Sequence, residues 1–83
     1  MTRDNIRRAL LQALTTIAPE VDAEALEPSK PLRRQVDLDS ADWLNFLVEV
    51  HELLGVEISD AEAAKLSTLE MLIDHCAARA KRE

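Results

Sequence analysis

Residues 40–54 place apolar side chains at a spacing typical of one face of an α-helix. At about 100° per residue, the largest of them fall within roughly 80° of Trp43; they are Phe46, Leu47, Val50, Leu53 and Leu54. Asp39 precedes the segment as a good N-cap, and Gly55 follows it as a residue that can adopt a left-handed conformation. The pattern therefore predicts a helix that buries one wide apolar stripe.

A second apolar set on the same helix lies outside this stripe, at about 100–160° from Trp43; it consists of Ala41, Leu44 and Val48. Asp42, Asn45, Glu49 and Glu52 fill the remaining face. A small helical core does not need so wide an apolar arc on one helix. Two explanations for the additional apolar residues stay open. Either the preceding loop covers the three residues, or they form a docking surface with apolar anchors and a charged rim.

Two other segments predict long helices, residues 3–18 and residues 68–80. Their apolar faces consist of Ile6, Ala9, Leu10, Ala13, Leu14 and Ile17 in the first, and of Leu69, Leu72, Ile73, Cys76 and Ala80 in the second. A short helix is expected over residues 59–66, because Ser59 and Glu62 have the spacing of a capping box.

Residues 19–39 predict a long connection, since Pro28, Pro31 and scattered charges interrupt any helical period. Spaced apolar residues can pin this connection to the core: Val21, Leu26, Leu32, Val36 and Leu38. The expected fold class is all-α, a small four-helix bundle with three long helices and one short one. We expect residues 1–83 to form a single domain, with the long loop between the first two helices.

The charge distribution excludes some partners and favours others. The net charge is −6, and residues 40–60 contain five acidic residues and no Lys or Arg. Such a segment argues against a nucleic-acid ligand, whose phosphates need basic neutralisation, and favours basic protein partners. A solvated acidic face that only keeps the chain soluble is the alternative.

Several sequence features indicate where in the cell the protein is expected. No apolar run approaches the roughly 20 residues of a membrane span. The N-terminal segment is charged and amphipathic, unlike a signal peptide, and one cysteine makes no internal disulfide. We expect a cytoplasmic monomer.

Ser40 stands between Asp39 and Asp42 where a helix begins. Taken alone, a serine there is usually a cap, although a helix N-terminus also favours a bound anion. A hydrolase would need a histidine close to the serine, and His51 lies about 16 Å further along the helix at 1.5 Å per residue. There is no GxSxG motif, no paired zinc ligands and no calcium loop with its glycine. The sequence predicts neither an enzyme nor a resident metal site.

The whole arrangement resembles the acyl carrier protein family, the carrier domains that bind phosphopantetheine. The resemblance is strongest over LDSADWLNFLVEVHELLGVEIS, residues 38–59: aspartate and serine, an acidic amphipathic helix, then a large apolar residue, glycine and a short apolar strip. The following LSTLEMLIDHC is similar to the entry of the family's last helix.

This resemblance implies that Ser40 is the attachment point of a 4′-phosphopantetheine arm, taken from coenzyme A and joined by a phosphodiester. Asp39 would assist recognition by a phosphopantetheinyl transferase. The positions that match the family's partner-facing surface are Ala41, Asp42, Leu44, Val48, Glu49 and Glu52.

The expected function is that of a freestanding carrier, because the chain starts with Met1 and ends in a charged tail. It would hold acyl or aminoacyl groups as thioesters for loading and downstream enzymes of fatty-acid, polyketide or nonribosomal-peptide biosynthesis. The alternative is a helical adaptor that docks through residues 40–54 and is never modified.

The chain also departs from the family pattern. Ala41 follows the serine where Leu or Met is usual, and Asp37 stands where a glycine is frequent. Arg33 adds positive charge to the long loop, as does its neighbour Arg34. Two bulky residues, Trp43 and Phe46, are expected to fill the space in which a long acyl chain could hide, which would favour small or polar cargo.

Overall fold

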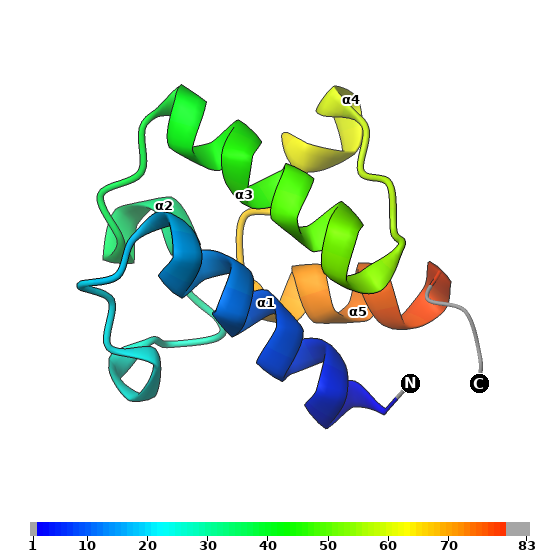
Figure 1. Ribbon diagram of the computed structural model, residues 1–83, viewed down its shortest axis with the longest axis horizontal. Coiled ribbons are helices and arrows are strands. Elements are labelled where there is room, and N and C mark those ends of the chain that lie inside the picture. Colours follow the sequence, from blue (N-terminus) through cyan, green and yellow to red (C-terminus); the bar gives the residue numbers. More distant parts are fainter. Residues whose placement is uncertain (1, 80–83) are drawn as a thin grey trace.

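Six helical segments follow one another in the computed structural model, which describes residues 2–79 (Figure 1). They are α1 (Arg3–Ile17), the 3₁₀ helix η1 (Ala23–Ala25), α2 (Leu32–Gln35), α3 (Ser40–Leu54), α4 (Asp60–Ala63) and α5 (Leu69–Arg79). The described residues contain no β-strand, and the predicted all-α bundle class is confirmed.

The long connection holds more structure than the sequence predicted, because η1 and α2 both lie within residues 19–39. The short helix α4 ends at Ala63, whereas the sequence suggested a helix over 59–66; the chain turns there with Lys65 N–H donating to the Glu62 carbonyl. Residue 80, the expected end of the last helix, lies outside the described residues.

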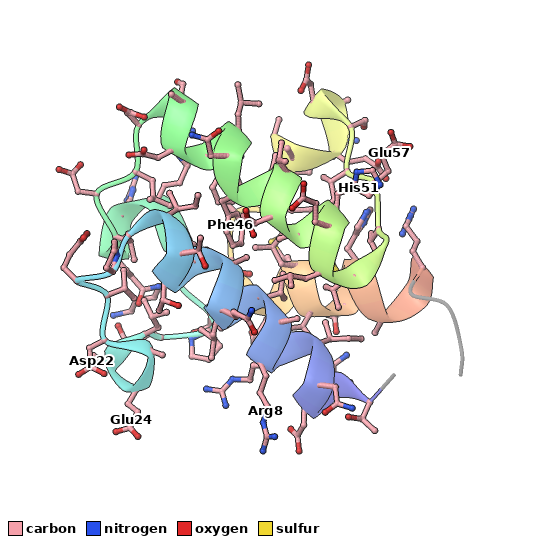
Figure 2. All side chains as sticks on the ribbon, viewed as in Figure 1. Arg8, Asp22, Glu24, Phe46, His51 and Glu57 are labelled. Carbon is pink, nitrogen blue, oxygen red and sulfur yellow. The ribbon has the colours of Figure 1, made fainter. Side chains whose placement is uncertain are left out.

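The apolar stripe of α3 forms the centre of the core. Phe46 and Val50 are fully buried, and α3 packs against α1 (Figures 1 and 2). The rings of Trp43 and Phe46 stack with their centroids 5.3 Å apart and an interplanar angle of 30°. Burying one large apolar side chain contributes about 1.5–3 kcal/mol to folding, so this stripe determines how α3 is rotated in the bundle.

The helix α1 supports α3 on one side and α5 on the other. The Thr2 hydroxyl caps α1 by accepting the Asn5 N–H at 3.1 Å. Four residues of α1 are buried in the core (Ile6, Leu10, Ala13 and Leu14), and they face Leu69, Leu72, Ile73 and Cys76 of α5 within the same cluster. Cys76 is a small core residue, as expected, and its burial raises the pKa of its thiol to about 11.

The connection between α1 and α3 is fastened to the start of α5. Leu32 N–H donates to the Ser67 carbonyl at 2.7 Å, and Glu70 N–H donates to the Pro28 carbonyl at 3.1 Å. Three of the predicted apolar pins are buried (Leu32, Val36 and Leu38), while Val21 and Leu26 are half-buried against the core. These anchors hold α2 in a defined place beside the N-terminal end of α3.

Gln35 closes the turn that precedes α2. Its amide donates to the carbonyls of Glu27 and Lys30 at 2.8 and 3.0 Å, and its oxygen accepts the Glu27 N–H at 2.6 Å. One side chain therefore contacts three backbone groups of the loop, one of which, the Glu27 carbonyl, also accepts the Lys30 N–H at 3.2 Å.

Glu62 ties α4 to α5. Its carboxylate accepts the Ser59 N–H at 3.1 Å, which completes a capping box with the Ser59 hydroxyl. The same carboxylate lies 3.5 Å from His75 Nε2, without hydrogen-bond geometry, and 3.4 Å from an Arg79 nitrogen. The hydrogen bonds from Ser59, followed by the charges of His75 and Arg79, lower the pKa of Glu62 below its ordinary value of 4.5.

Replacing Phe46 with Ala should lower the free energy of unfolding by about 3–5 kcal/mol, because the side chain is fully buried and leaves a cavity. Leu44→Ala, on the same helix but 54% exposed, should change it by no more than about 0.5 kcal/mol. Urea unfolding followed by circular dichroism measures both values. Similar losses in the two variants would contradict the assigned rotation of α3.

Replacing Glu62 with Gln should lower Tm at neutral pH, because the ionised carboxylate is favoured in the folded state. A lowered pKa contributes stability that is complete above the ordinary value of 4.5 and is lost as the pH falls through the folded-state pKa. The Tm of Glu62→Gln and that of the wild type should therefore converge in acid. Glu20→Gln, at an exposed position, is the matched control. A Tm difference that is constant with pH would refute the assignment.

Candidate functional site

Ser40 is the first residue of α3, and its side chain is exposed. The helix is capped by the preceding residue: Asp39 Oδ1 accepts the Asp42 N–H at 2.8 Å. Asp42 Oδ2 in turn lies 3.5 Å from the Asp39 nitrogen and completes a capping box. The prediction of Asp39 as the N-cap is confirmed, and the Ser40 hydroxyl is not needed for this task.

Ser59 shows what a capping serine does in the same chain. Its hydroxyl accepts the Glu62 N–H at 3.2 Å at the start of α4. Among the described residues, no hydrogen bond involves the Ser40 hydroxyl in this way. Ser40 therefore combines an exposed hydroxyl with a helix start whose capping is already complete, and the capping explanation of this serine is wrong.

The second apolar set of α3 is exposed at the surface of the molecule. Leu44 is 54% exposed and Val48 is 56% exposed, and Ala41 is exposed beside them. The long connection instead packs its apolar residues into the core through Leu32 and Val36. The loop therefore leaves an apolar strip on α3 open at the surface.

The acidic residues predicted for the same surface divide into two groups. Glu52 is exposed and lies at about 180° from Trp43, close to Val48 at about 140° on the helical wheel. Asp42 and Glu49 lie at about 240–260° and are half-buried. Ala41, Leu44, Val48 and Glu52 therefore share one exposed face of α3, whereas Asp42 and Glu49 lie on the adjoining, half-buried face.

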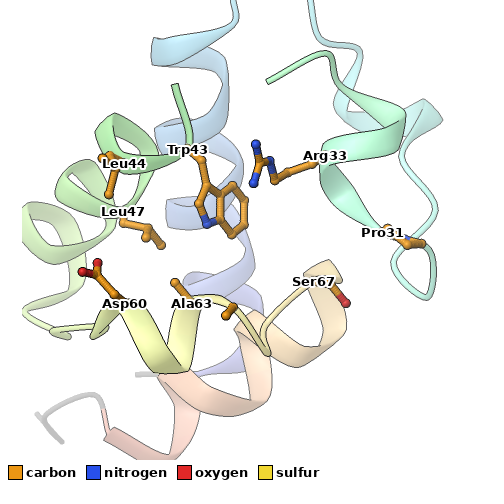
Figure 3. A pocket seen from close by; sticks show the side chains of 9 residues that line it. Pro31, Arg33, Trp43, Leu44, Leu47, Asp60, Ala63 and Ser67 are labelled. Atoms are coloured by element: carbon orange, nitrogen blue, oxygen red, sulfur yellow. The ribbon is translucent and has the colours of Figure 1, made fainter. Parts of the chain in front are cut away.

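A cleft opens next to this strip, between α3, α4 and the segment around α2 (Figure 3). Its volume is about 370 Å³, and its lining consists of Pro31, Arg33, Trp43, Leu44, Leu47, Asp60, Ala63, Ala64 and Ser67. A second hollow of about 360 Å³ continues along α3 and shares Leu44, Leu47 and Asp60 with the first. The lining is mainly apolar, with charged groups at separate points, as in many small-ligand sites.

Arg33 is the cleft residue whose position sequence reasoning missed. Its guanidinium carbon lies 5.8 Å from the centroid of the Trp43 ring, and one of its N–H groups donates to the Leu38 carbonyl at 3.4 Å. Figure 3 shows the side chain extending from α2 toward the indole. No spacing in the sequence could have found this pair, because the two residues belong to elements that only the tertiary fold brings together.

The two histidines lie away from Ser40. His51 is in the last turn of α3, at the opposite end of the helix, where it lines the second hollow with Glu57 (Figure 2). His75 lies on α5 next to Glu62. Among residues 2–79, no three His, Cys, Asp or Glu side chains gather in a way that could hold a metal ion.

The described helices are too short or too polar to cross a bilayer.

The sequence of the chain is similar to those of known proteins. The family model described as "Phosphopantetheine attachment site" matches residues 8–76. The chain belongs to the acyl carrier protein family. An acyl carrier protein of Rubrobacter xylanophilus is 32% identical over 72 residues, which cover 83% of this chain and 89% of that protein. An acyl carrier protein of Thermosynechococcus vestitus is 31% identical over 64 residues, 77% of this chain and 79% of that protein.

Membership establishes the cofactor and the general role. The chain is a carrier protein, and its cofactor is a covalently attached 4′-phosphopantetheine. The helical bundle with its long first connection is the fold that the resemblance implied. The matched span includes all of α3, whose start bears the exposed Ser40 hydroxyl, so the described site fits such a group.

Replacing Asp39 with Ala should lower the free energy of unfolding by about 1 kcal/mol, because the N-cap acceptor is lost. Asp39→Asn should cost less, since Asn caps about as well as Asp. Urea unfolding of both variants measures the difference. An equal loss in the two variants would show that the carboxylate charge at the helix start, and not the capping hydrogen bond, carries the stability.

Proposed function

We propose that the chain is a carrier that is modified at Ser40 and presents acyl or aminoacyl groups to biosynthetic enzymes. When attached, the arm supplies a terminal thiol that holds the cargo as a thioester. The carrier itself performs no catalysis in this proposal. We also propose a cytoplasmic location, supported by a fold whose single cysteine is buried and which needs no oxidising compartment.

The observation that carries the proposal is the exposed Ser40 hydroxyl at a helix start that Asp39 already caps. A phosphopantetheinyl transferase would join the serine oxygen to the diphosphate phosphorus of coenzyme A that bears the pantetheine. The bond from this phosphorus to the bridging oxygen would break, and adenosine 3′,5′-bisphosphate would leave. The base for the serine proton belongs to the transferase, which agrees with the placement of His51 and His75 away from Ser40.

Asp39 has two tasks in this proposal. Its Oδ1 holds the first turn of α3, while its side chain stays exposed next to Ser40. An exposed carboxylate beside the reacting hydroxyl suits recognition by a basic surface on the transferase.

The open strip on α3 is the proposed docking surface for the transferase, for the loading enzyme and for downstream enzymes. Leu44 and Val48 supply apolar anchors, and Ala41 between Ser40 and these anchors leaves room for a partner side chain. Asp42, Glu49 and Glu52 add a rim of negative charge. Partners that fit this surface carry an apolar patch surrounded by Lys and Arg.

The bulky residues of α3 limit the size of the cargo that the bundle could enclose. The stacked Trp43 and Phe46 occupy the interior next to α1, and the open cleft lies outside them along Leu44 and Leu47. We propose that small or polar cargo is preferred, because the buried rings of Phe46 and Trp43 fill space inside the bundle. Sequestration of a chain of eight or more carbons inside the bundle would contradict this preference.

The deciding experiment is intact-mass analysis after incubation with coenzyme A, Mg²⁺ and a broad-specificity phosphopantetheinyl transferase. Wild type should gain one phosphopantetheine group and Ser40→Ala should gain none. Ser59→Ala is the matched control, because it removes the other helix-start serine and should leave the mass gain intact. A wild type that stays unmodified with several transferases, or a gain that survives in Ser40→Ala, would refute the proposed site.

The exposed strip also supports a second candidate, an adaptor that docks through α3 without modification. The same variants separate the two functions. An adaptor would keep its binding and its biological activity after Ser40→Ala, whereas a carrier would keep its docking surface and lose all function.

A further inference from the structure

We propose that the guanidinium of Arg33 binds an anionic oxygen group carried by the arm beside Trp43, and thereby positions the arm or selects its cargo. The proposal deepens the proposed function and rests on attachment of the arm at Ser40. The group that Arg33 would bind is an oxyanion close to the indole ring of Trp43.

The first argument is the geometry of the guanidinium. It lies over the Trp43 ring at 5.8 Å from the centroid and lines the cleft with Leu44 and Leu47 (Figure 3). Among the described contacts, one hydrogen bond occupies it, to the Leu38 carbonyl at 3.4 Å. Because a guanidinium has five N–H donors in a planar fork, this arrangement leaves donors for a bidentate oxyanion beside the indole.

The second argument is the charge around the cleft. Residues 35–64, which include all of α3 and α4, contain no Lys or Arg. The carboxylates of Asp39 and Asp42 lie at the helix start next to Ser40, and Asp60 lines the opposite side of the cleft. These carboxylates would repel an anion on the arm. Arg33, which lies on α2 over Trp43, would attract it, so the anion would bind beside Arg33.

The third argument is the direction of the arm. On the helical wheel Ser40 lies at about 60° from Trp43, between Trp43 and Leu44, and both of these residues line the cleft. Leu47 lies about 10 Å further along α3 at 1.5 Å per residue. An arm attached at Ser40 would therefore leave α3 on the side of Trp43 and Leu44, where Arg33 could bind its oxygens.

Two anions could occupy this place: the phosphodiester that joins the arm to Ser40, or a carboxylate at the far end of the cargo. Each of them has two oxygens that can accept hydrogen bonds from the same guanidinium. In the first case Arg33 orients the arm for every cargo. In the second it selects cargo that bears a free carboxylate over neutral cargo of the same length.

The experiment uses Trp43 as a reporter, because it is the only tryptophan of the chain. Wild type, Arg33→Gln, Arg33→Lys and Arg34→Gln are each prepared unmodified, with the arm alone, with a butyryl group and with a succinyl group. The transferase loads them from coenzyme A or its acyl derivatives, and intact mass verifies each species. Trp43 emission and its indole ¹H–¹⁵N cross-peak are then compared between forms of the same variant.

A change on adding the arm alone that is lost in Arg33→Gln would support the proposal with the phosphodiester as the anion. A change with succinyl but not butyryl that is lost in Arg33→Gln would support it with the cargo carboxylate. In either case Arg34→Gln, which removes the same charge one residue away, should behave as wild type. Arg33→Lys should retain part of the change, because it keeps the charge but not the planar fork.

Equal changes in wild type and Arg33→Gln, or no change in any loaded form, would overturn the role of Arg33. These results are distinguishable from failure of the proposed function, which would appear earlier as a missing mass gain at Ser40 and would remove both proposals. Circular dichroism of the unmodified variants shows that all are folded before the comparison is made.

Discussion

Burial of the α3 stripe against α1 is the interaction on which the rest of the structure depends. Phe46 and Val50 are fully buried, and their positions allow α3 one rotation in the bundle. Once that rotation is set, every other side chain of the helix has a defined direction. The packing of the stripe therefore directs Leu44 and Val48 to the open surface.

The connection between α1 and α3 completes the site from the other side. Its anchors to the start of α5, together with the turn closed by Gln35, place α2 where Arg33 meets Trp43. A flexible loop of this length would lose much conformational entropy on ordering, and its buried apolar residues offset that cost. The cleft therefore has one wall from a regular helix and another from an ordered loop.

Capping and function are divided among neighbouring residues at the start of α3. Asp39 and Asp42 satisfy each other's backbone groups, so the hydroxyl of Ser40 is not needed for the cap. Sequence reasoning identified the cap, the stripe and the serine, because each depends on spacing within one helix. It left open whether Leu44 and Val48 were covered, since that depends on where a loop distant in sequence lies.

The sequence by itself determined the helical class, the buried stripe of α3, the cap at Asp39 and the resemblance to carrier proteins, because all of these follow from local periodicity and motif. The tertiary structure alone decided that η1 and α2 form within the connection, that the apolar strip is exposed and that a cleft lies beside this strip. It also decided the meeting of Arg33 and Trp43. The reason is physical: exposure and contact between elements depend on how the connection packs, and hydrophobic burial specifies which residues are inside without specifying which segments become neighbours.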